Sequence, residues 1–323
     1  MERGYPRLLG DIGGTNARWA WQPDAASAPQ HVVVRSTAHD ASIYDSAAAY
    51  LEQLGRGAPV WAGIGVATPV AGDEVRLTNS GWVFSIARLE AALGVERCLV
   101  VNDFTALALS LAALGAADLR RIAGGGTARA DHAIALLGPG TGLGVSGLVP
   151  DGRGGFVPLA GEGGHATLAP ADDDESELLA RLRRRHGHVS AERVLSGPGL
   201  VALYEVLCER AGRAPARLAP AAVTDAALAG TDPQCVQALA VFTRMLGSVA
   251  GNLALTLGAL GGVYIGGGIV PRLGARFDDA GFRRGFEEKG RFAEYLRPIP
   301  AWVVMAPNPA LIGASRALDL LPR

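Results

Sequence analysis

The stretch Leu8–Trp21, LLGDIGGTNARWAW, decides the fold that we expect for this chain. It consists of a short apolar run, a polar turn and a second apolar run, which is the pattern of a β-hairpin. The adjacent glycines Gly13 and Gly14 carry no Cβ, so a ligand can approach the backbone closely there. Successive N–H groups in such a turn suit a phosphate oxygen. On this stretch alone, an ordinary hairpin with a glycine-rich turn is an equal alternative.

The carboxylate of Asp11 restricts what this turn could bind. A carboxylate repels phosphate, so Asp11 fits beside one only if a cation lies between them. Mg²⁺ is a hard ion that bridges carboxylates or waters to phosphates. A magnesium-bound phosphate is therefore the ligand that this turn favours.

The same layout returns later in the chain. Apolar residues at 133–137 lead into a turn, Gly138-Pro139-Gly140-Thr141-Gly142, and a second apolar run follows at 143–149. A repeat at a domain-length interval predicts two related halves. Ligands commonly bind between such halves.

Composition excludes several classes of protein. The formal net charge is −1 and basic residues form no block, which gives no support for a nucleic-acid or membrane surface. The only lysine is Lys289, so a Walker-type phosphate loop with its Gly-Lys pair is absent from the sequence. Three scattered cysteines indicate neither a disulfide framework nor a metal cluster and favour a reducing compartment. The most apolar run, 249–270, is interrupted by Asn252 and by glycines, so we expect a buried helix followed by a strand.

Apolar periodicity predicts a mixed sheet with helices packed on it. We place the crossing between the two halves in the turn-rich segment 115–131. Strands are expected at 31–36, 60–67, 98–101, 263–265 and 301–305, and helices at 41–54, 85–93, 104–114, 172–186, 196–211, 234–257 and from 313.

Asn102 and Asp103 end the apolar run at 98–101 and precede a helix. Side chains at the carboxyl end of a strand are often catalytic in α/β proteins. An ionised Asp103 could take the proton of a hydroxyl as that oxygen attacks phosphorus, which is the positioning that phosphoryl transfer requires. Helix capping by these two residues is an equally good explanation.

A second polar set comprises Glu162, His165 and Glu192. Glu162 and His165 lie in AGEGGH, a loop with too much glycine for a helix. Glu192 is expected to open a short helix over 189–195, where a favourable interaction with the helix dipole is the simpler role. Zinc binding is disfavoured, because the histidines lack zinc-site spacing and no cysteine is near.

Two other motifs are excluded because the residues around them do not fit. The run 142–147 matches G-x-G-x-x-G but leads into Pro150 rather than a helix, so a Rossmann fold is not supported. Ser146 and Ser196 lack the flanking glycines of a nucleophile elbow.

Taken in order, the motifs DIGGTNAR, VVNDFTA, GPGTGLGV, GEGGH, GHVSAERVLSGPGL and GGVYIGGGIVPR run through nearly the whole chain. In this the chain resembles the bacterial ATP-dependent glucokinases, which belong to the actin-like sugar kinases. The resemblance implies an α/β fold of two ribonuclease-H-like domains, with mixed sheets flanked by helices and an active site in the cleft between the domains. It places the small domain at 1–113 plus 304–323 and the large domain at 114–303.

The resemblance also implies a reaction: transfer of the γ-phosphoryl group of ATP to the 6-hydroxyl of D-glucose, as the entry step of glycolysis. Asp103 matches the catalytic base, and glucose contacts fall to Asn102, Asp103, Glu162, His165 and Glu192. Mg²⁺ carried by ATP would lie near Asp11, without a separate metal site. The nucleotide contacts are those of three turns: Asp11, Gly13, Gly14, Thr15 and Asn16, then Gly140, Thr141 and Gly142, then Gly266, Gly267 and Gly268.

The same resemblance implies a cytoplasmic homodimer. The cysteine-rich zinc motif of repressor-type relatives is missing after His165, so no structural zinc is expected. Only seven residues precede Leu8 in this sequence, which is too few for a repressor's helix-turn-helix. A kinase for another hexose such as mannose, or a non-catalytic actin-like nucleotide-binding protein, remains an alternative.

Overall fold

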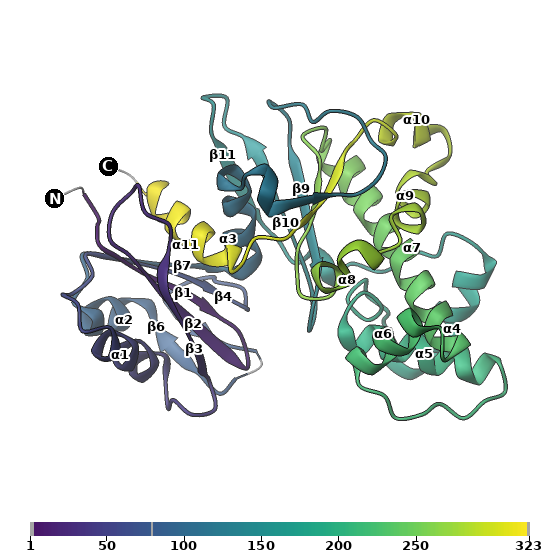
Figure 1. The fold of residues 1–323 in the computed structure, drawn as a ribbon, viewed down its shortest axis with the longest axis horizontal. Coiled ribbons are helices and arrows are strands. Elements are labelled where there is room, and N and C mark those ends of the chain that lie inside the picture. The colour runs from purple at the N-terminus through teal and green to yellow at the C-terminus, as the bar shows by residue number, and fades with distance from the viewer. Residues whose placement is uncertain (1–2, 79, 322–323) are drawn as a thin grey trace. The chain divides into compact units, whose positions relative to one another are not determined.

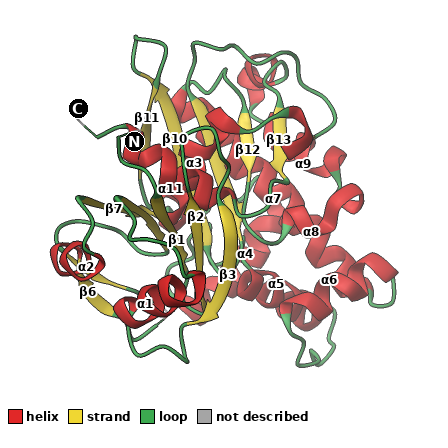
Figure 2. Ribbon diagram, turned by 60° about the vertical axis from the view of Figure 1, so that its left-hand side comes forward, coloured by secondary structure: helices red, strands yellow, loops and turns green. Residues whose placement is uncertain are grey.

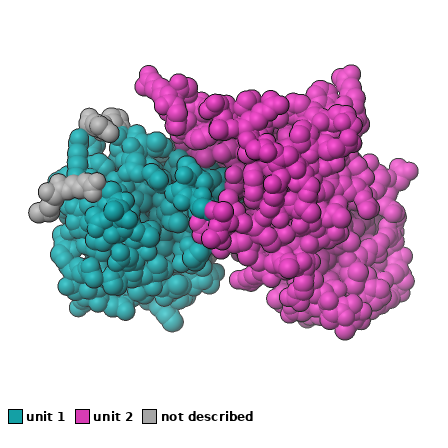
Figure 3. Space-filling model, turned by 45° about the horizontal axis from the view of Figure 1, so that its top comes forward, with its two compact units in different colours: residues 1–115, 306–323 teal, residues 116–305 magenta. Residues whose placement is uncertain are grey.

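A computed structural model describes residues 3–78 and 80–321 (Figure 1). The chain divides into two compact units, Met1–Gly115 with Ala306–Arg323 and Ala116–Met305 (Figure 3). Each unit contains a mixed sheet with helices packed against it (Figure 2). The expected mixed α/β class is therefore confirmed.

The first unit is built on a five-stranded sheet in the order β3-β2-β1-β4-β7. Strands β1, β2 and β3 form an antiparallel meander, whereas β4 and β7 run parallel to β1. The hairpin expected at the opening stretch is present as β1 and β2. The bounds are β1 Arg7–Ile12, β2 Asn16–Gln22, β3 Gln30–Ser36, β4 Trp61–Val66 and β7 Arg97–Asn102, with a separate hairpin β5 Glu74–Arg76 and β6 Val83–Ser85.

Alternation along β1 gives its two faces to different helices. Leu8 and Ile12 belong to the core that includes residues of α1 and α2, whereas Leu9 packs with Leu311 of α11. Helices α3 and α11 lie side by side against β4 (Figure 1). These helices are α1 Ile43–Leu54, α2 Ile86–Leu93, α3 Asp103–Ser110 and α11 Pro309–Asp319.

The second unit repeats this strand arrangement. Its sheet has the order β11-β10-β9-β12-β13-β8, in which β9, β10 and β11 form an antiparallel meander and β12 and β13 run parallel to β9. The internal repeat read from the two glycine turns is thus present in the topology. The bounds are β8 Leu119–Arg121, β9 Ile134–Pro139, β10 Leu143–Pro150, β11 Phe156–Ala160, β12 Val263–Ile265 and β13 Ala301–Val304.

Helices supply most of the large core of the second unit. They are α4 Asp173–His186, α5 Gly197–Arg210, α6 Pro220–Ala229, α7 Pro233–Leu257, α8 Val270–Leu273, α9 Asp279–Glu287 and α10 Ala293–Leu296. Only α7, among the described residues, is long and apolar enough to cross a membrane by length and composition. It contacts α5, α6 and α9, and Phe242 and Leu246 on it are fully buried, so it serves as a core helix.

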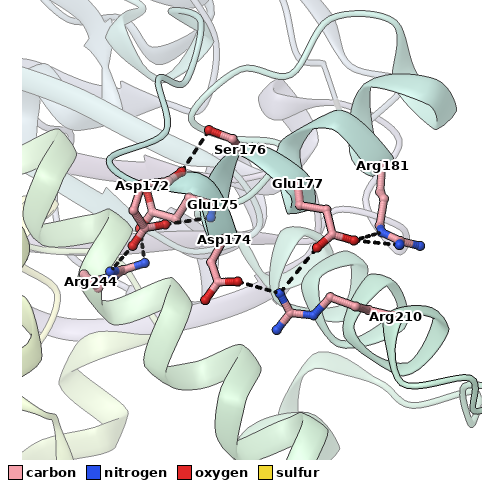
Figure 4. A network of polar contacts seen from close by, with 8 residues as sticks. All are labelled: Asp172, Asp174, Glu175, Ser176, Glu177, Arg181, Arg210 and Arg244. Atoms are coloured by element: carbon pink, nitrogen blue, oxygen red, sulfur yellow. Dashed lines mark hydrogen bonds and ion pairs between the residues drawn. The ribbon is translucent and has the colours of Figure 1, made fainter.

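Ion pairs fasten α4 to two neighbouring helices (Figure 4). Arg244 of α7 contacts Asp172 at 2.6 Å and the buried Glu175 at 2.8 Å, and Arg210 of α5 contacts Asp174 at 3.3 Å. Asp172 also caps α4, and the Glu175 N–H together with Arg244 lowers the pKa of its carboxyl. These acids therefore both complement the dipole of α4 and fasten the helix to its neighbours.

The structure corrects several local predictions. Segment 189–195 forms bends and turns instead of the expected helix, while Gly163–His165 forms a single 3-10 turn instead of an open loop. The turn-rich segment 115–131 contains β8, which is short and pairs with β13. The last helix begins at Pro309, four residues before the expected start. At Ala191, Glu192 and β8, hydrogen bonds to distant residues override weak local preference.

Close packing of α11 fixes the position of α3. A Cβ at Gly313 of α11 would lie 1.6 Å from the carbonyl oxygen of Ala106 in α3. A Cβ at Gly63 of β4 would lie 2.4 Å from the carbonyl oxygen of Ala314. The backbones of helix and strand therefore meet with no room for a side chain at either glycine.

We expect Gly313→Ala to lower the free energy of unfolding by about 1–3 kcal/mol, because the added methyl group forces α11 away from α3. Urea unfolding followed by circular dichroism measures this change. Gly57→Ala is the control, since a Cβ there meets nothing within 4 Å. Equal stability of the two variants would show that α11 is not held by this contact.

Candidate functional site

The first glycine turn and Asp103 lie at the same edge of the first sheet. Strand register pairs Ile12 with Val66 in β4, and Val66 with Asn102 in β7. The turn follows β1 directly and Asp103 follows β7, so two strand spacings, about 10 Å, separate the two strand ends. The sequence predicted that the turn and Asp103 each lie at the end of an apolar strand. The strand register shows that these two strand ends lie at the same edge of the sheet.

Hydrogen bonds from two directions hold the first turn. The Gly13 N–H donates to the Asn16 carbonyl oxygen at 2.9 Å, across the hairpin. From the end of β3, the Thr37 hydroxyl donates to the Gly14 carbonyl oxygen at 2.7 Å, and the Thr37 N–H donates to the Thr15 carbonyl oxygen at 3.0 Å. Thr37, the residue after β3, thus occupies the carbonyl oxygens of Gly14 and Thr15. Neither glycine has a positive φ, so the backbone conformation of the turn does not itself require glycine.

Asp11 is the acidic side chain in β1 just before the first turn. Alternation puts it on the same face of β1 as Leu9, the face covered by α11. Arg18, its cross-strand partner, contacts Asp11 Oδ2 at 3.2 Å. Burial raises the pKa of the Asp11 carboxyl, and Arg18 partly offsets that rise. A partly buried carboxylate with a single cationic partner suits a second cation nearby, so the side chain fits the magnesium ion of a nucleotide complex.

Asn102 is the N-cap of α3, which is one of the two roles that the sequence left open for it. Its Oδ1 accepts from the Phe104 N–H at 2.9 Å and from the Thr105 N–H at 3.2 Å. Its Nδ2 donates to Asp103 Oδ1 at 3.0 Å, and the Phe104 N–H donates to the same oxygen at 2.9 Å. Capping and orientation of the half-buried Asp103 are therefore two effects of one side chain, and the alternatives left open by the sequence are compatible.

In the second unit, the second glycine turn lies beside the glycine triplet. Strand β9 ends at Pro139, whose carbonyl oxygen accepts from the Gly268 N–H at 3.1 Å. The Gly266 N–H donates to the Leu137 carbonyl oxygen at 2.9 Å. The Gly140 carbonyl oxygen accepts from Gly197, the first residue of α5, at 2.8 Å. The three-residue turn Gly140–Gly142 is thus fixed at the carboxyl edge of its sheet, next to Gly266–Gly268.

The predicted polar set comes together in the same unit. His165 Nε2 lies 3.9 Å from Glu162 Oε2, and His165 Nδ1 lies 3.9 Å from Glu192 Oε1. The side chains of Glu162 and His165 are about half exposed, whereas that of Glu192 is less exposed. Such a group offers carboxylate acceptors and an imidazole to a ligand rich in hydroxyl groups. In the described part of the chain, no three His, Cys, Asp or Glu side chains are grouped to hold a metal ion.

A protein-family model matches nearly the whole sequence. The glucokinase model matches residues 8–320. The chain is also 54% identical over 316 residues to a glucokinase of Aromatoleum aromaticum, an alignment that covers 98% of this chain and 95% of the relative. The chain belongs to the glucokinase family.

Solved structures agree with this membership. A glucokinase from an Antarctic psychrotroph has a TM-score of 0.87 and 37% identity, with 97% of this chain and 98% of that one covered. A ROK family glucokinase from Streptomyces griseus, in complex with glucose and AMPPNP, has a TM-score of 0.64 and 20% identity over 97% of this chain and 98% of that one. At 20% identity, the similarity to the Streptomyces griseus structure shows only that the two chains share a fold.

Two contacts of the site were not foreseen from the sequence. Thr37 holds the first turn from a neighbouring strand, and Leu143 donates its N–H to Glu192 Oε2 at 2.9 Å. Thr37 directly follows an apolar strand, which is a weak signal in hindsight. Leu143 gives no signal at all, since its contribution is a backbone N–H.

We expect Thr37→Val to loosen the first turn, because the Gly14 carbonyl oxygen loses a hydroxyl donor. One such bond is worth about 1 kcal/mol, so amide hydrogens of residues 13–16 should exchange about fivefold faster. Hydrogen–deuterium exchange with mass spectrometry measures this. In the control Thr256→Val, a hydroxyl bond to Asn252 within α7 is removed instead, and the turn should exchange as in the wild type. Unchanged exchange in Thr37→Val would contradict the role of Thr37.

Proposed function

We propose that this member of the glucokinase family transfers the γ-phosphoryl group of ATP to the 6-hydroxyl of D-glucose, giving glucose 6-phosphate and ADP, with Asp103 as the general base. The observation that carries the proposal is the shared sheet edge of the first glycine turn and Asp103. A glycine turn and a carboxylate on strand ends about 10 Å apart span the distance between a bound phosphate chain and an acceptor hydroxyl. The glucose and AMPPNP named with the Streptomyces griseus structure support the choice of ligands.

The reaction needs a proton acceptor placed before the substrate arrives. Asp103 takes the proton of the 6-hydroxyl as its oxygen forms a bond to the γ-phosphorus, and the bond from that phosphorus to the β–γ bridging oxygen breaks to release ADP. The donors on Asp103 Oδ1, from Asn102 and Phe104, hold the carboxylate in one orientation. Little reorganisation is then needed when the sugar binds.

The remaining candidate residues are assigned either to binding of the sugar or to binding of the nucleotide. We assign the sugar hydroxyls to Asn102, Glu162, His165 and Glu192, because a site of paired polar groups rejects a substrate that lacks one of its hydroxyls. We assign the phosphates and the adenosine side to three segments: Asp11–Asn16, Gly140–Gly142 and Gly266–Gly268. Mg²⁺ bound with ATP would neutralise phosphate charge near Asp11.

The family resemblance suggests further properties of the intact enzyme. We propose that the intact enzyme has a small domain, 1–113 with 304–323, and a large domain, 114–303, and that substrate binding excludes water as a competing acceptor. We also propose a cytoplasmic homodimer. Light scattering of the purified chain distinguishes a dimer from a monomer.

The proposed reaction is tested by ADP release from purified protein with Mg²⁺–ATP and a panel of D-glucose, D-mannose, D-fructose and 6-deoxy-D-glucose. We expect kcat/KM for glucose to exceed that for the other hexoses by about tenfold or more, and 6-deoxyglucose to give no turnover because it lacks the acceptor hydroxyl. A preference for mannose would refute the substrate but not the chemistry. No sugar-dependent release at all would refute the kinase.

We expect Asp103→Asn to lower kcat by about 10²–10⁴-fold while leaving the affinity for AMPPNP nearly unchanged, because the amide cannot accept the hydroxyl proton. Asp173→Asn is the matched control: Asp173 is likewise the first residue of a helix and should keep full turnover. Steady-state kinetics and calorimetry measure the two effects. Near-normal turnover in Asp103→Asn would mean that another group is the base.

A further inference from the structure

We infer that Glu192 links sugar binding to nucleotide binding inside the second unit, through a contact that requires glycine at position 142. The inference rests on the proposed function, because it takes the sugar contact of Glu192 and the phosphate role of the Gly140–Gly142 turn from there. It goes further in assigning one carboxylate to both ligands.

One oxygen of Glu192 lies under the nucleotide turn. The Leu143 N–H, directly after that turn, donates to Glu192 Oε2 at 2.9 Å. A Cβ built on Gly142 would lie 2.3 Å from the same oxygen, which is closer than two non-bonded atoms can approach. The carboxylate therefore occupies the space that any side chain at position 142 would need.

The other oxygen faces the sugar side. Glu192 Oε1 lies 3.9 Å from His165 Nδ1 in the polar set assigned to glucose. The side chain is one-third exposed, so this oxygen can still be reached from solvent. Sugar hydroxyls bound to Oε1 and His165 would hold the carboxylate where Oε2 supports Leu143.

The backbone joins the same three segments. The Glu192 N–H donates to the Gly164 carbonyl oxygen at 2.8 Å, between Glu162 and His165 in sequence. Gly164 in turn lies so close to Leu143 that a Cβ on it would be 2.0 Å from the Leu143 carbonyl oxygen. The loop of His165, the segment of Glu192 and the start of β10 thus form one tightly packed junction, and displacing one member disturbs the other two.

Such a junction couples the two ligands energetically. A hydrogen bond to an ionised carboxylate is stronger than a neutral one. If glucose stabilises the position of Glu192, it also stabilises the turn that binds phosphate, and the effect must be equal in the reverse direction. We expect each ligand to tighten the other by about fivefold, the factor that corresponds to one hydrogen bond.

The sharpest test measures glucose affinity without any nucleotide. We expect Gly142→Ala to bind D-glucose about fivefold or more weakly in calorimetric titration, because its methyl group displaces the carboxylate. Gly140→Ala is the matched control in the same turn, since a Cβ there meets only the Gly268 backbone nitrogen at an ordinary 3.7 Å. It should bind glucose like the wild type. The displaced atom, Glu192 Oε2, is the end of a flexible side chain, so the Gly142→Ala variant should keep its fold. Thermal unfolding of this variant, compared with that of Gly140→Ala, checks this.

A second pair of variants keeps the test decisive if Gly142→Ala unfolds. The affinity for Mg²⁺–AMPPNP is measured with and without saturating D-glucose in Glu192→Ala and Glu162→Ala. Both should weaken glucose binding, but only Glu192→Ala should abolish the mutual tightening, because no contact joins the Glu162 side chain to the turn among those found in the described residues.

The possible outcomes distinguish failure of the proposed link through Glu192 from failure of the proposed kinase function. Glucose affinity in Gly142→Ala within twofold of wild type, or retained coupling in Glu192→Ala, overturns the inference while kinase activity stands. Absence of glucose-dependent ADP release from the wild type overturns the proposed function itself.

Discussion

Parallel strands that are neighbours in a sheet end at the same edge, and the candidate site depends on this constraint. In the first unit, β1, β4 and β7 bring the glycine turn and Asp103 to one edge although they are far apart in sequence. In the second unit, β9 and β12 do the same for Gly140–Gly142 and Gly266–Gly268. Close approach of helices secures the arrangement, since Gly313 and Gly63 allow α11 to pack directly on backbone.

The repeat shows how one topology can support two different sets of contacts. The strands β1, β4 and β7 correspond to β9, β12 and β13 in order and direction. A glycine turn follows the first strand of each set, so the proposed phosphate contacts are duplicated. The third strand is followed by Asn102 and Asp103 in one unit and by Met305 in the other, so the proposed base occurs only once. The polar set of Glu162, His165 and Glu192, proposed to bind sugar hydroxyls, lies in the second unit.

Local chemistry explains what the sequence could and could not predict. Ser85 and Ser196 cap α2 and α5 at the starts expected from the sequence, because a cap bonds to a backbone N–H only three residues along the chain. The helix expected at 189–195 does not form, since the N–H groups of Ala191 and Glu192 bond to the distant carbonyl oxygens of Ala166 and Gly164. Strand β8 was missed because its three residues gain their pairing only from β13. Asn102 and Asp103 could be singled out because they end an apolar strand, whereas Thr37 and the Leu143 N–H act across the fold.

The place of α11 in the first unit has a consequence for biosynthesis. This helix covers one face of the β1–β4 sheet, yet it follows the whole second unit in the chain. The second unit is continuous in the chain and is fully synthesised before α11 emerges. Although nascent domains usually fold from the N-terminus onward, Gly63 and Leu9 of the first unit stay uncovered until α11 has been synthesised. The unit that carries Asp103 is therefore completed only after synthesis of the entire second unit.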